Sequence, residues 1–269
     1  MTKILILGGT GKTGSRVARR LTDAGRPVRV ASRAGGFDLD DTTTWAPALD
    51  GVTAAYLVEP DLRTGRLPGF VAAAVSAGVR RLVLLSAGGV GEADDRHPLK
   101  AAEAAVRESG AEWTILRPDW FAQNFGEGPW LPAILAGTLA LPTGDGRTPF
   151  VDAEDIAEVA ASALTGRHHG RTYRLTGPRA IGFGEAAEMI GKATGRVIHY
   201  ADVSPEVHIG HLIANGVPPG IARLLTGILV AVRDGAVPAP TDDVERALGR
   251  SAGSFEDYVT RAAAAGAWT

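Results

Sequence analysis

Near its start the chain carries an apolar run that leads directly into glycines: Ile4-Leu5-Ile6-Leu7-Gly8-Gly9-Thr10-Gly11-Lys12-Thr13-Gly14. Apolar residues then recur at helical spacing, at Val17, Ala18 and Leu21. A strand, a tight glycine turn and a helix in this order are typical of a unit that binds nucleotide phosphates. The sequence therefore predicts a phosphate-binding turn in the first strand-helix unit.

The glycines of this turn meet different steric requirements. Gly8 lets the chain leave the strand in a conformation that a Cβ would forbid, Gly11 lets backbone amides approach a pyrophosphate, and Gly14 lets the helix pack closely on the strand. The positive end of the helix then points at the phosphates. A Walker A loop would need a glycine where Ile6 stands, which argues against a P-loop NTPase. An ordinary strand-to-helix turn is the alternative.

The composition indicates a globular α/β protein. With 269 residues, 45% hydrophobic and 22% charged, the chain can bury a large core. Its formal net charge of -2 predicts no basic face, so we expect no nucleic-acid partner. The absence of cysteine excludes disulfides and thiolate chemistry and fits a reducing compartment. The first apolar run is too short for a signal peptide and residues 221–232 are too short for a membrane span, so we expect a cytoplasmic protein with no membrane partner.

The second predicted strand, at residues 27–32, ends in Ser32 and is followed by Arg33. In a dinucleotide-binding fold this strand end meets the adenosine ribose, where an acidic residue binds the 2′-hydroxyl of NAD and an arginine accommodates the 2′-phosphate of NADP. No acidic residue follows until Asp38. Arg33 can pair with a phosphate and Ser32 can donate a hydrogen bond, so the sequence favours NADP (NADPH) as cofactor. A solvated loop arginine is the alternative.

Further strands are predicted at residues 54–58, 81–86 and 113–116, and helices at residues 67–77 and 98–109 separate them. This alternation predicts an α/β fold with a Rossmann-like doubly wound parallel sheet. The carboxyl ends of parallel strands border the ligand crevice. The predicted cofactor-binding residues are therefore Gly8, Gly9, Thr10, Gly11, Lys12, Thr13, Gly14, Ser32, Arg33, Leu57, Val58, Glu59, Pro60, Ser86, Ala87 and Pro118.

Several motifs in a fixed order carry a family resemblance: the glycine turn, the strand end at Ser86, residues 113–118 after a Ser-Gly pair, and residues 149–157. Together they resemble the NmrA-like branch of the atypical short-chain dehydrogenase/reductases. Within it the chain looks most like bacterial relatives of fungal ergot alkaloid dehydrogenases, which are NADPH-dependent iminium reductases. The resemblance covers nearly the whole chain. It implies a Rossmann core at residues 1–150 and a smaller, mainly helical C-terminal lobe at residues 151–269, interleaved with the core to form a substrate pocket.

The sequence departs from the wider superfamily at the usual catalytic acid, the tyrosine of Tyr-x-x-x-Lys. Lys100 stands in the expected helix, but Arg96 occupies the position four residues before it, and none of the four tyrosines has a lysine four residues later. The candidate catalytic residues are therefore Ser86, His97 and Lys100. Each also has a structural interpretation: a strand-end hydroxyl that caps a turn, a residue at a helix start, and a solvated lysine.

A missing acid restricts the chemistry. Hydride transfer to a neutral carbonyl builds negative charge on oxygen and needs a proton donor, whereas hydride transfer to an iminium neutralises an existing positive charge. We therefore expect an oxidoreductase of small-molecule metabolism that reduces an iminium or another conjugated electrophile. Two alternatives stay open: an NADP-binding redox sensor that regulates a protein partner without turnover, and an isomerase or lyase that retains its cofactor. The oligomeric state is left open.

An aromatic cluster follows the fifth strand, where a substrate pocket would lie. We expect Trp120, Phe121, Asn124 and Trp130 to contact the substrate, because flat aromatic faces suit a polycyclic or aromatic molecule and tryptophan favours a cation. Core packing is the alternative for these residues.

Two polar patterns further along have structural interpretations. Asp152 is expected to cap a helix over residues 153–164, with Asp155 in its first turn, rather than to form an acid/base dyad. His208 and His211 lie three residues apart on a predicted helix, but no third ligand is in view, so we expect no metal site.

Overall fold

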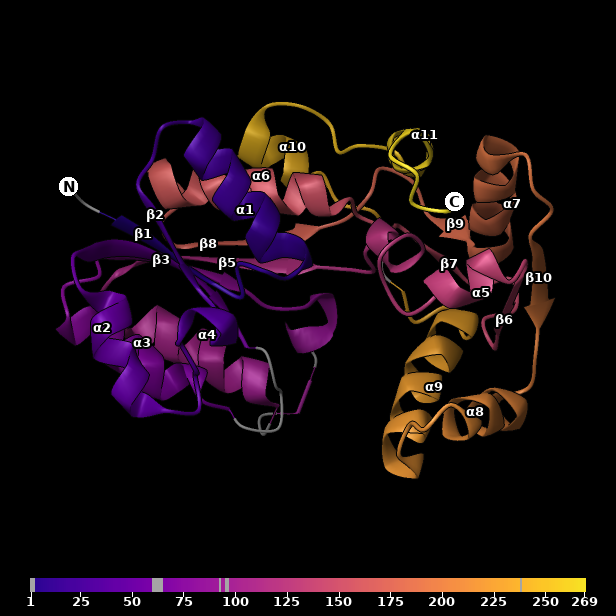
Figure 1. Cartoon of the computed structure of the whole chain (residues 1–269), viewed down its shortest axis with the longest axis horizontal. Coiled ribbons are helices and arrows are strands. Elements are labelled where there is room, and N and C mark those ends of the chain that lie inside the picture. Colours follow the sequence, from indigo (N-terminus) through magenta and orange to yellow (C-terminus); the bar gives the residue numbers. More distant parts are fainter. Residues whose placement is uncertain (1–2, 60–64, 92, 95–96, 238) are drawn as a thin grey trace. The chain divides into compact units, whose positions relative to one another are not determined.

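The computed structural model describes residues 3–59, 65–91, 93–94, 97–237 and 239–269. The chain forms two compact units, each built from three segments (Figure 1). Unit 1 comprises Met1–Asp119, Ala153–Thr176 and Asp242–Ala252, and unit 2 comprises Trp120–Asp152, Gly177–Thr241 and Gly253–Thr269. This division differs from the expected boundary at residue 150, because two later segments return to complete the sheet unit.

The centre of unit 1 is a six-stranded parallel sheet with the strand order β2-β1-β3-β4-β5-β8. The strands are β1 (Lys3–Leu7), β2 (Val28–Ala31), β3 (Val52–Val58), β4 (Arg81–Leu85), β5 (Glu112–Pro118) and β8 (Arg171–Leu175). The order reverses between β1 and β3, which confirms the predicted doubly wound, Rossmann-like sheet. The strand expected at residues 113–116 is longer in the structure, because β5 continues to Pro118, which pairs with Leu175 of β8.

Helices cover both faces of this sheet (Figure 1). One face carries α1 (Lys12–Asp23), α6 (Ala153–Thr165) and α10 (Asp243–Leu248), and the other carries α2 (Trp45–Leu49), α3 (Leu67–Ser76) and α4 (Pro98–Glu108). The core under α2, α3 and α4 includes Leu5, Leu57 and Leu84 from the strands and Phe70 from α3. Because side chains alternate along a strand, Tyr56 points to the opposite face.

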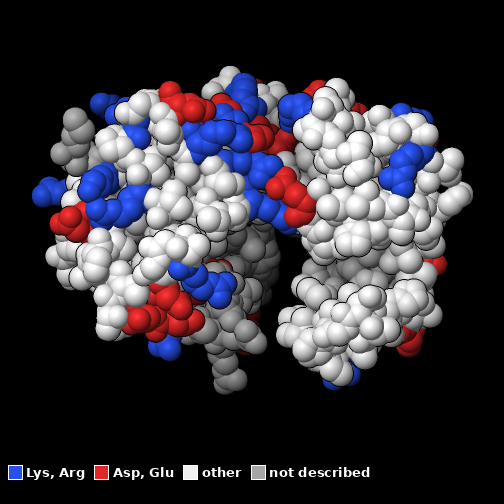
Figure 2. Space-filling view, in the orientation of Figure 1, with Lys and Arg blue, Asp and Glu red and all other residues white. Residues whose placement is uncertain are grey.

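An ion-pair network joins α1, α6 and the segment after α10. Glu154 of α6 pairs with three arginines of α1, namely Arg16, Arg19 and Arg20. Glu158 pairs with Arg20 and with Arg250, and Arg250 also pairs with Asp155. Figure 2 shows basic and acidic side chains gathered over these helices. Partial burial opposes ionisation of Glu154, but the hydrogen bond and charge of Arg19, with the charges of Arg20 and Arg16, hold the pKa of this carboxyl below its ordinary value. The network therefore fastens α6 to α1.

Unit 2 is mainly helical, as expected for the smaller lobe. Its strands are β6 (Thr138–Leu141) parallel to β10 (His199–Asp202), and β7 (Arg147–Thr148) antiparallel to β9 (Ile181–Gly182). Its helices are α5 (Leu131–Leu135), α7 (Phe183–Thr194), α8 (Pro205–Ala214), α9 (Pro219–Arg233) and α11 (Phe255–Ala264). Within the described ranges, no helix combines the length and apolar character needed to cross a bilayer.

Candidate cofactor site and active site

A cavity of about 580 Å³ opens at the carboxyl ends of β1, β2 and β3 in unit 1. Its walls come from the glycine turn, from the loop after β2 and from the end of β3. The lining residues are Leu7, Gly8, Thr10, Gly11, Lys12, Thr13, Ala31, Ser32, Arg33, Phe37, Asp38, Leu39, Asp40 and Val58. The structure thus brings the predicted phosphate turn and the predicted ribose contacts, Ser32 and Arg33, into one site.

The glycine turn has the geometry expected of a phosphate cradle. Gly8 has a φ of 61°, in the left-handed region, and its carbonyl accepts a hydrogen bond from the Gly11 amide at 2.8 Å. A Cβ on Gly14 would collide with the Gly8 carbonyl, whose carbon would be 2.7 Å away, and a Cβ on Gly9 would lie 2.5 Å from Cγ1 of Val30. Gly9 and Gly14 therefore shape the cavity without lining it.

Helix α1 presents its N-terminus to this cavity. Its N-cap residue is Gly11, and no side-chain hydrogen bond caps its first turn. Amides at a helix start without such a cap remain available to an anion, and the helix dipole favours negative charge there. This end of the cavity can therefore hold a pyrophosphate.

The ribose end of the cavity carries an available cation. Ser32 caps the short 3₁₀ turn Arg33–Gly35, since its hydroxyl accepts the Gly35 amide at 3.3 Å. The Arg33 side chain is exposed and has no ion-pair partner among the residues that the structure describes. An unpaired guanidinium beside a phosphate cradle can hold a further phosphate in a bidentate contact.

Residues 37–40, which were not among the predicted cofactor-binding residues, also line the cavity. Phe37 and Leu39 are buried, whereas Asp38 is half-buried and Asp40 is exposed and pairs with Arg66 at 3.1 Å. Gly36, with a φ of 79°, turns the chain back toward the cavity after the 3₁₀ turn. The alternation of apolar and acidic residues after a Gly-Gly pair was the signal that could have identified this wall.

Several predicted cofactor residues lie outside this cavity. Leu57 is fully buried in the core, and Glu59 uses its carboxylate to accept the Leu67 amide at the start of α3. Ala87 lies two residues after the end of β4, and Pro118 is the last residue of β5. Pro60 falls outside the described residues. For these positions, contact with a cofactor stays a prediction.

Ser86 takes part in a buried ionic cluster at the end of β4. Its hydroxyl donates to Oε1 of Glu103 at 2.6 Å, and Glu103 is only 1% exposed. Arg117 binds both carboxylate oxygens at 2.8 and 2.6 Å, and Arg107 binds Oε2 at 2.9 Å. Burial opposes the charge, but hydrogen bonds from Arg117 and Ser86 and the two arginine charges hold the pKa of Glu103 below its ordinary value. The Ser86 proton is thus committed to Glu103, which leaves the hydroxyl oxygen as an acceptor.

The other candidate catalytic residues lie at the start of α4. Nδ1 of His97 accepts the Leu99 amide at 3.2 Å, so His97 caps the helix. In the neutral ring this contact places the proton on Nε2, where it can be donated. Lys100 lies in the first turn and is half-buried. The structural role expected for His97 is present, and a catalytic role stays a prediction.

The predicted substrate residues lie in unit 2, at the edge of its aromatic core. Trp130 is 7% exposed and packs on Phe125, with 4.7 Å between ring centroids. Trp120 is half-buried and stacks on Trp130 at 5.5 Å. Phe121 and Asn124 are also half-buried. Trp130 therefore packs in the core of unit 2, whereas the other three keep exposed surface that a ligand can reach.

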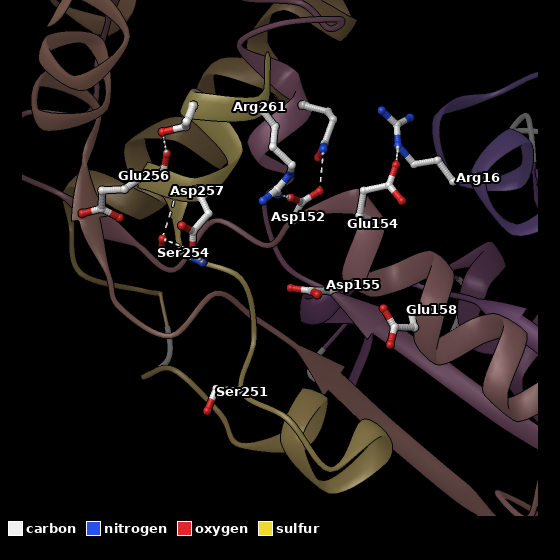
Figure 3. Close-up of polar contacts among 12 residues, drawn as sticks. Arg16, Asp152, Glu154, Asp155, Glu158, Ser251, Ser254, Glu256, Asp257 and Arg261 are labelled. Atoms are coloured by element: carbon white, nitrogen blue, oxygen red, sulfur yellow. Dashed lines mark hydrogen bonds and ion pairs between the residues drawn. The ribbon is translucent and has the colours of Figure 1, made fainter. Parts of the chain in front are cut away.

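Asp152 and Asp155 have separate arginine partners. Asp152 is buried, accepts the side-chain amide of Gln123 at 2.7 Å and pairs with Arg261 (Figure 3). Asp155 pairs with Arg250 at 2.8 Å. Because each carboxylate is held by its own arginine, these contacts favour structural roles over an acid/base dyad.

The parallel sheet, the glycine cradle and the available arginine define a dinucleotide-binding protein of the Rossmann class. The profile of a family described as NAD(P)H-binding matches residues 8–167. The chain therefore belongs to this NAD(P)H-binding family, and it is an NAD(P)H-dependent oxidoreductase.

Relatives match over nearly the whole chain. An uncharacterized oxidoreductase, YesF, of Bacillus subtilis is 37% identical, over 99% of this chain and 96% of its own. A (4-alkanoyl-5-oxo-2,5-dihydrofuran-3-yl)methyl phosphate reductase of Streptomyces griseus is 35% identical, over 95% and 96%. Festuclavine dehydrogenase of Aspergillus fumigatus is 32% identical, over 95% and 96%.

A solved structure shares the fold. The triphenylmethane reductase of a Citrobacter species, complexed with NADP(H), superposes with a TM-score of 0.77 at 22% identity, over 97% of this chain and 100% of that one.

Proposed function

We propose that this protein is an NADPH-dependent reductase that transfers hydride to an iminium or another conjugated electrophile of a small cyclic or aromatic metabolite. The observation that carries the proposal is the 2.6 Å hydrogen bond from Ser86 to the buried carboxylate of Glu103. The tyrosine that serves as catalytic acid in the superfamily is missing, and the Ser86 hydroxyl already donates its proton to Glu103. The end of β4 therefore offers a substrate the Ser86 oxygen as a hydrogen-bond acceptor. An electrophile that needs no proton in the transition state suits such a site.

The preference for NADPH rests on the ribose end of the cavity. Arg33 lines it without an ion-pair partner among the described residues, and the carboxylate of Asp40 already faces Arg66. A 2′-phosphate would supply the missing partner for Arg33.

The substrate class draws support from the relatives. The name of the Streptomyces enzyme describes a dihydrofuran ring whose double bond is conjugated with carbonyl groups, and other relatives are named as dehydrogenases of clavine alkaloids. Substrates of this kind accept hydride at carbon without direct attack on an isolated carbonyl. The half-exposed face of Trp120 would suit a flat or cationic ring.

The cofactor assignment is tested with Arg33→Asp. Fluorescence titration should show NADPH binding weakened by about 10- to 100-fold, since a charge-assisted phosphate contact is lost, while NADH binding changes little. Arg223→Asp, an exposed position on α9, is the matched control and should leave both affinities unchanged. Equal losses for NADPH and NADH in Arg33→Asp would overturn the 2′-phosphate assignment.

The substrate class is tested by NADPH oxidation with a cyclic iminium, an unsaturated lactone and a quinone. We expect turnover of the iminium to be insensitive to His97→Gln. The quinone, which must gain a proton on oxygen, should be slowed if His97 supplies that proton from Nε2. Tight NADPH binding with no turnover on any compound would refute the reductase and favour the sensor or the isomerase.

A further inference from the structure

A second cavity, of about 330 Å³, lies at the amino-terminal ends of the strands, whereas the glycine cradle lies at their carboxyl ends. It is formed where strands begin, because its walls include the starts of β1, β3, β4 and β5, the turn before β2 and the end of α6. Its lining residues are Ile4, Arg26, Pro27, Thr53, Ala54, Arg80, Arg81, Glu112, Leu164 and Thr165. No residue lines both cavities. The volume suits a small ligand rather than a dinucleotide.

One arginine of this cavity is already neutralised. Arg81 binds Glu112 through Nε at 2.8 Å and Nη2 at 2.5 Å. Its Nη1 also donates to the carbonyl of Leu164, near the end of α6, at 3.1 Å. Arg81 therefore neutralises the acidic residue of the lining and also satisfies a carbonyl at the end of a helix. The charge of Glu112 is therefore not available to the other two arginines.

Arg26 and Arg80 keep their charges uncompensated. Both side chains are exposed, and neither guanidinium has a hydrogen-bond or ion-pair partner in the part of the chain that the structure describes. Elsewhere in unit 1 arginines such as Arg107, Arg174 and Arg250 each hold a carboxylate. Two cations that line one cavity repel each other unless an anion lies between them.

The rest of the lining is small and largely apolar. Ile4, Pro27 and Ala54 form an apolar wall, and Ile4 is 8% exposed. The hydroxyl of Thr165 donates to the carbonyl of Ala161, so it can only accept a further hydrogen bond. An occupant therefore meets both cationic and apolar groups in the lining of this cavity.

We propose that this cavity is a second binding site, for a small organic anion whose phosphate or carboxylate is held by Arg26 and Arg80 and whose apolar part lies against Ile4, Pro27 and Ala54. Guanidinium groups bind both head groups through paired N–H donors, and they stay charged at any physiological pH. The site is independent of the proposed substrate and of the cofactor preference.

The test uses phenyl phosphate as the probe and benzoate as the carboxylate counterpart, titrated calorimetrically at low salt. The protein is first saturated with NADPH so that the glycine cradle is occupied. We expect wild-type protein to bind at least one of the two probes, and their relative affinity tells a phosphate site from a carboxylate site. The double variant Arg26→Gln/Arg80→Gln should bind the preferred probe at least about tenfold more weakly.

Arg223→Gln is the matched control, because it removes the same charge from an exposed arginine in unit 2 and should leave binding unchanged. Thermal melting of the variants checks that they are folded. Because the replaced arginines are exposed, we expect their melting temperatures to be unchanged. Absence of binding of both probes to wild-type protein, or equal affinity in wild-type and double variant, would overturn the proposal.

Discussion

Replacing Glu103 with glutamine should destabilise unit 1 far more than the same change at an exposed position. Glu103 is 1% exposed, receives a hydrogen bond from Ser86 and is held by Arg117 and Arg107 through three contacts of 2.6 to 2.9 Å. Glutamine keeps the shape but removes the charge, and its NH₂ group faces guanidinium donors. Breaking a buried ion pair costs about 3 to 5 kcal/mol. The Arg117 and Arg107 side chains are 22% and 38% exposed, so water can solvate them after the carboxylate is removed. We therefore expect the free energy of unfolding to fall by about 2 to 3 kcal/mol.

The assay is urea unfolding followed by circular dichroism, with the unfolding free energy compared between variants. Glu112→Gln is the matched control, because Glu112 pairs with Arg81 on the neighbouring strand but is 51% exposed, so its loss should be below about 1 kcal/mol. Equal, small losses for both variants would refute the reasoning that burial makes the Glu103 cluster important.

The same cluster predicts a pH dependence. The pKa of Glu103 is lower in the folded protein than its ordinary value of 4.5, so its contribution to stability is complete above that value. The contribution is lost as the pH falls through the folded pKa. The difference in unfolding free energy between wild-type and Glu103→Gln should therefore shrink as the pH is lowered below 4.5, and a constant difference would contradict this.

Two further changes test other parts of the chain. Gly14→Ala should weaken NADPH and NADH binding alike, by about tenfold or more in a fluorescence titration, because its Cβ would meet the backbone of Gly8 and displace the cradle. In unit 2, His208 hydrogen-bonds Thr226 at 2.8 Å, and burial, together with the nearby charge of His211, lowers its pKa. Hydrogen exchange of α8 and α9 amides should therefore quicken as the pH falls below 6.5, after correction for the intrinsic rate, and His208→Gln should flatten that dependence. Equal pH profiles in wild-type and variant would rule out His208 as the titrating group.

Local sequence signals were sufficient for the central sheet and the cradle. The apolar runs that end in Gly8, Ser86 and Pro118 each became a parallel strand, because such runs can be buried on both faces. The spacing of the glycines predicted the turn, because glycines such as Gly14 are required by atoms that lie only a few residues away in the chain. The position of Arg33 beside this turn could be predicted because Arg33 follows directly from the end of β2, and it lines the same cavity as the turn.

Features that depend on distant segments were not accessible in this way. Glu103 shares the inner face of α4 with Leu99 and Val106, but nothing local says that Ser86 and Arg117 complete a cluster around it. The boundary expected at residue 150 does not include the return of α6 and β8 to unit 1, where β8 pairs with a strand that ends more than fifty residues earlier. Pairing across such separations is set by the packing of the whole sheet, not by the residues of the strand alone.

The three-segment construction of unit 1 has a consequence for biosynthesis. The first five strands of the sheet are present once residue 118 has been translated, but the sixth, β8, ends at Leu175 and Arg250 reaches α6 only from near the C-terminus. Domains on a growing chain fold as their segments become available. The edge of β5 therefore stays uncovered on the ribosome until β8 has emerged, and unit 1 is complete only when residues 242–252 have followed. During that interval the open edge is a target for chaperones and for pairing with other nascent chains.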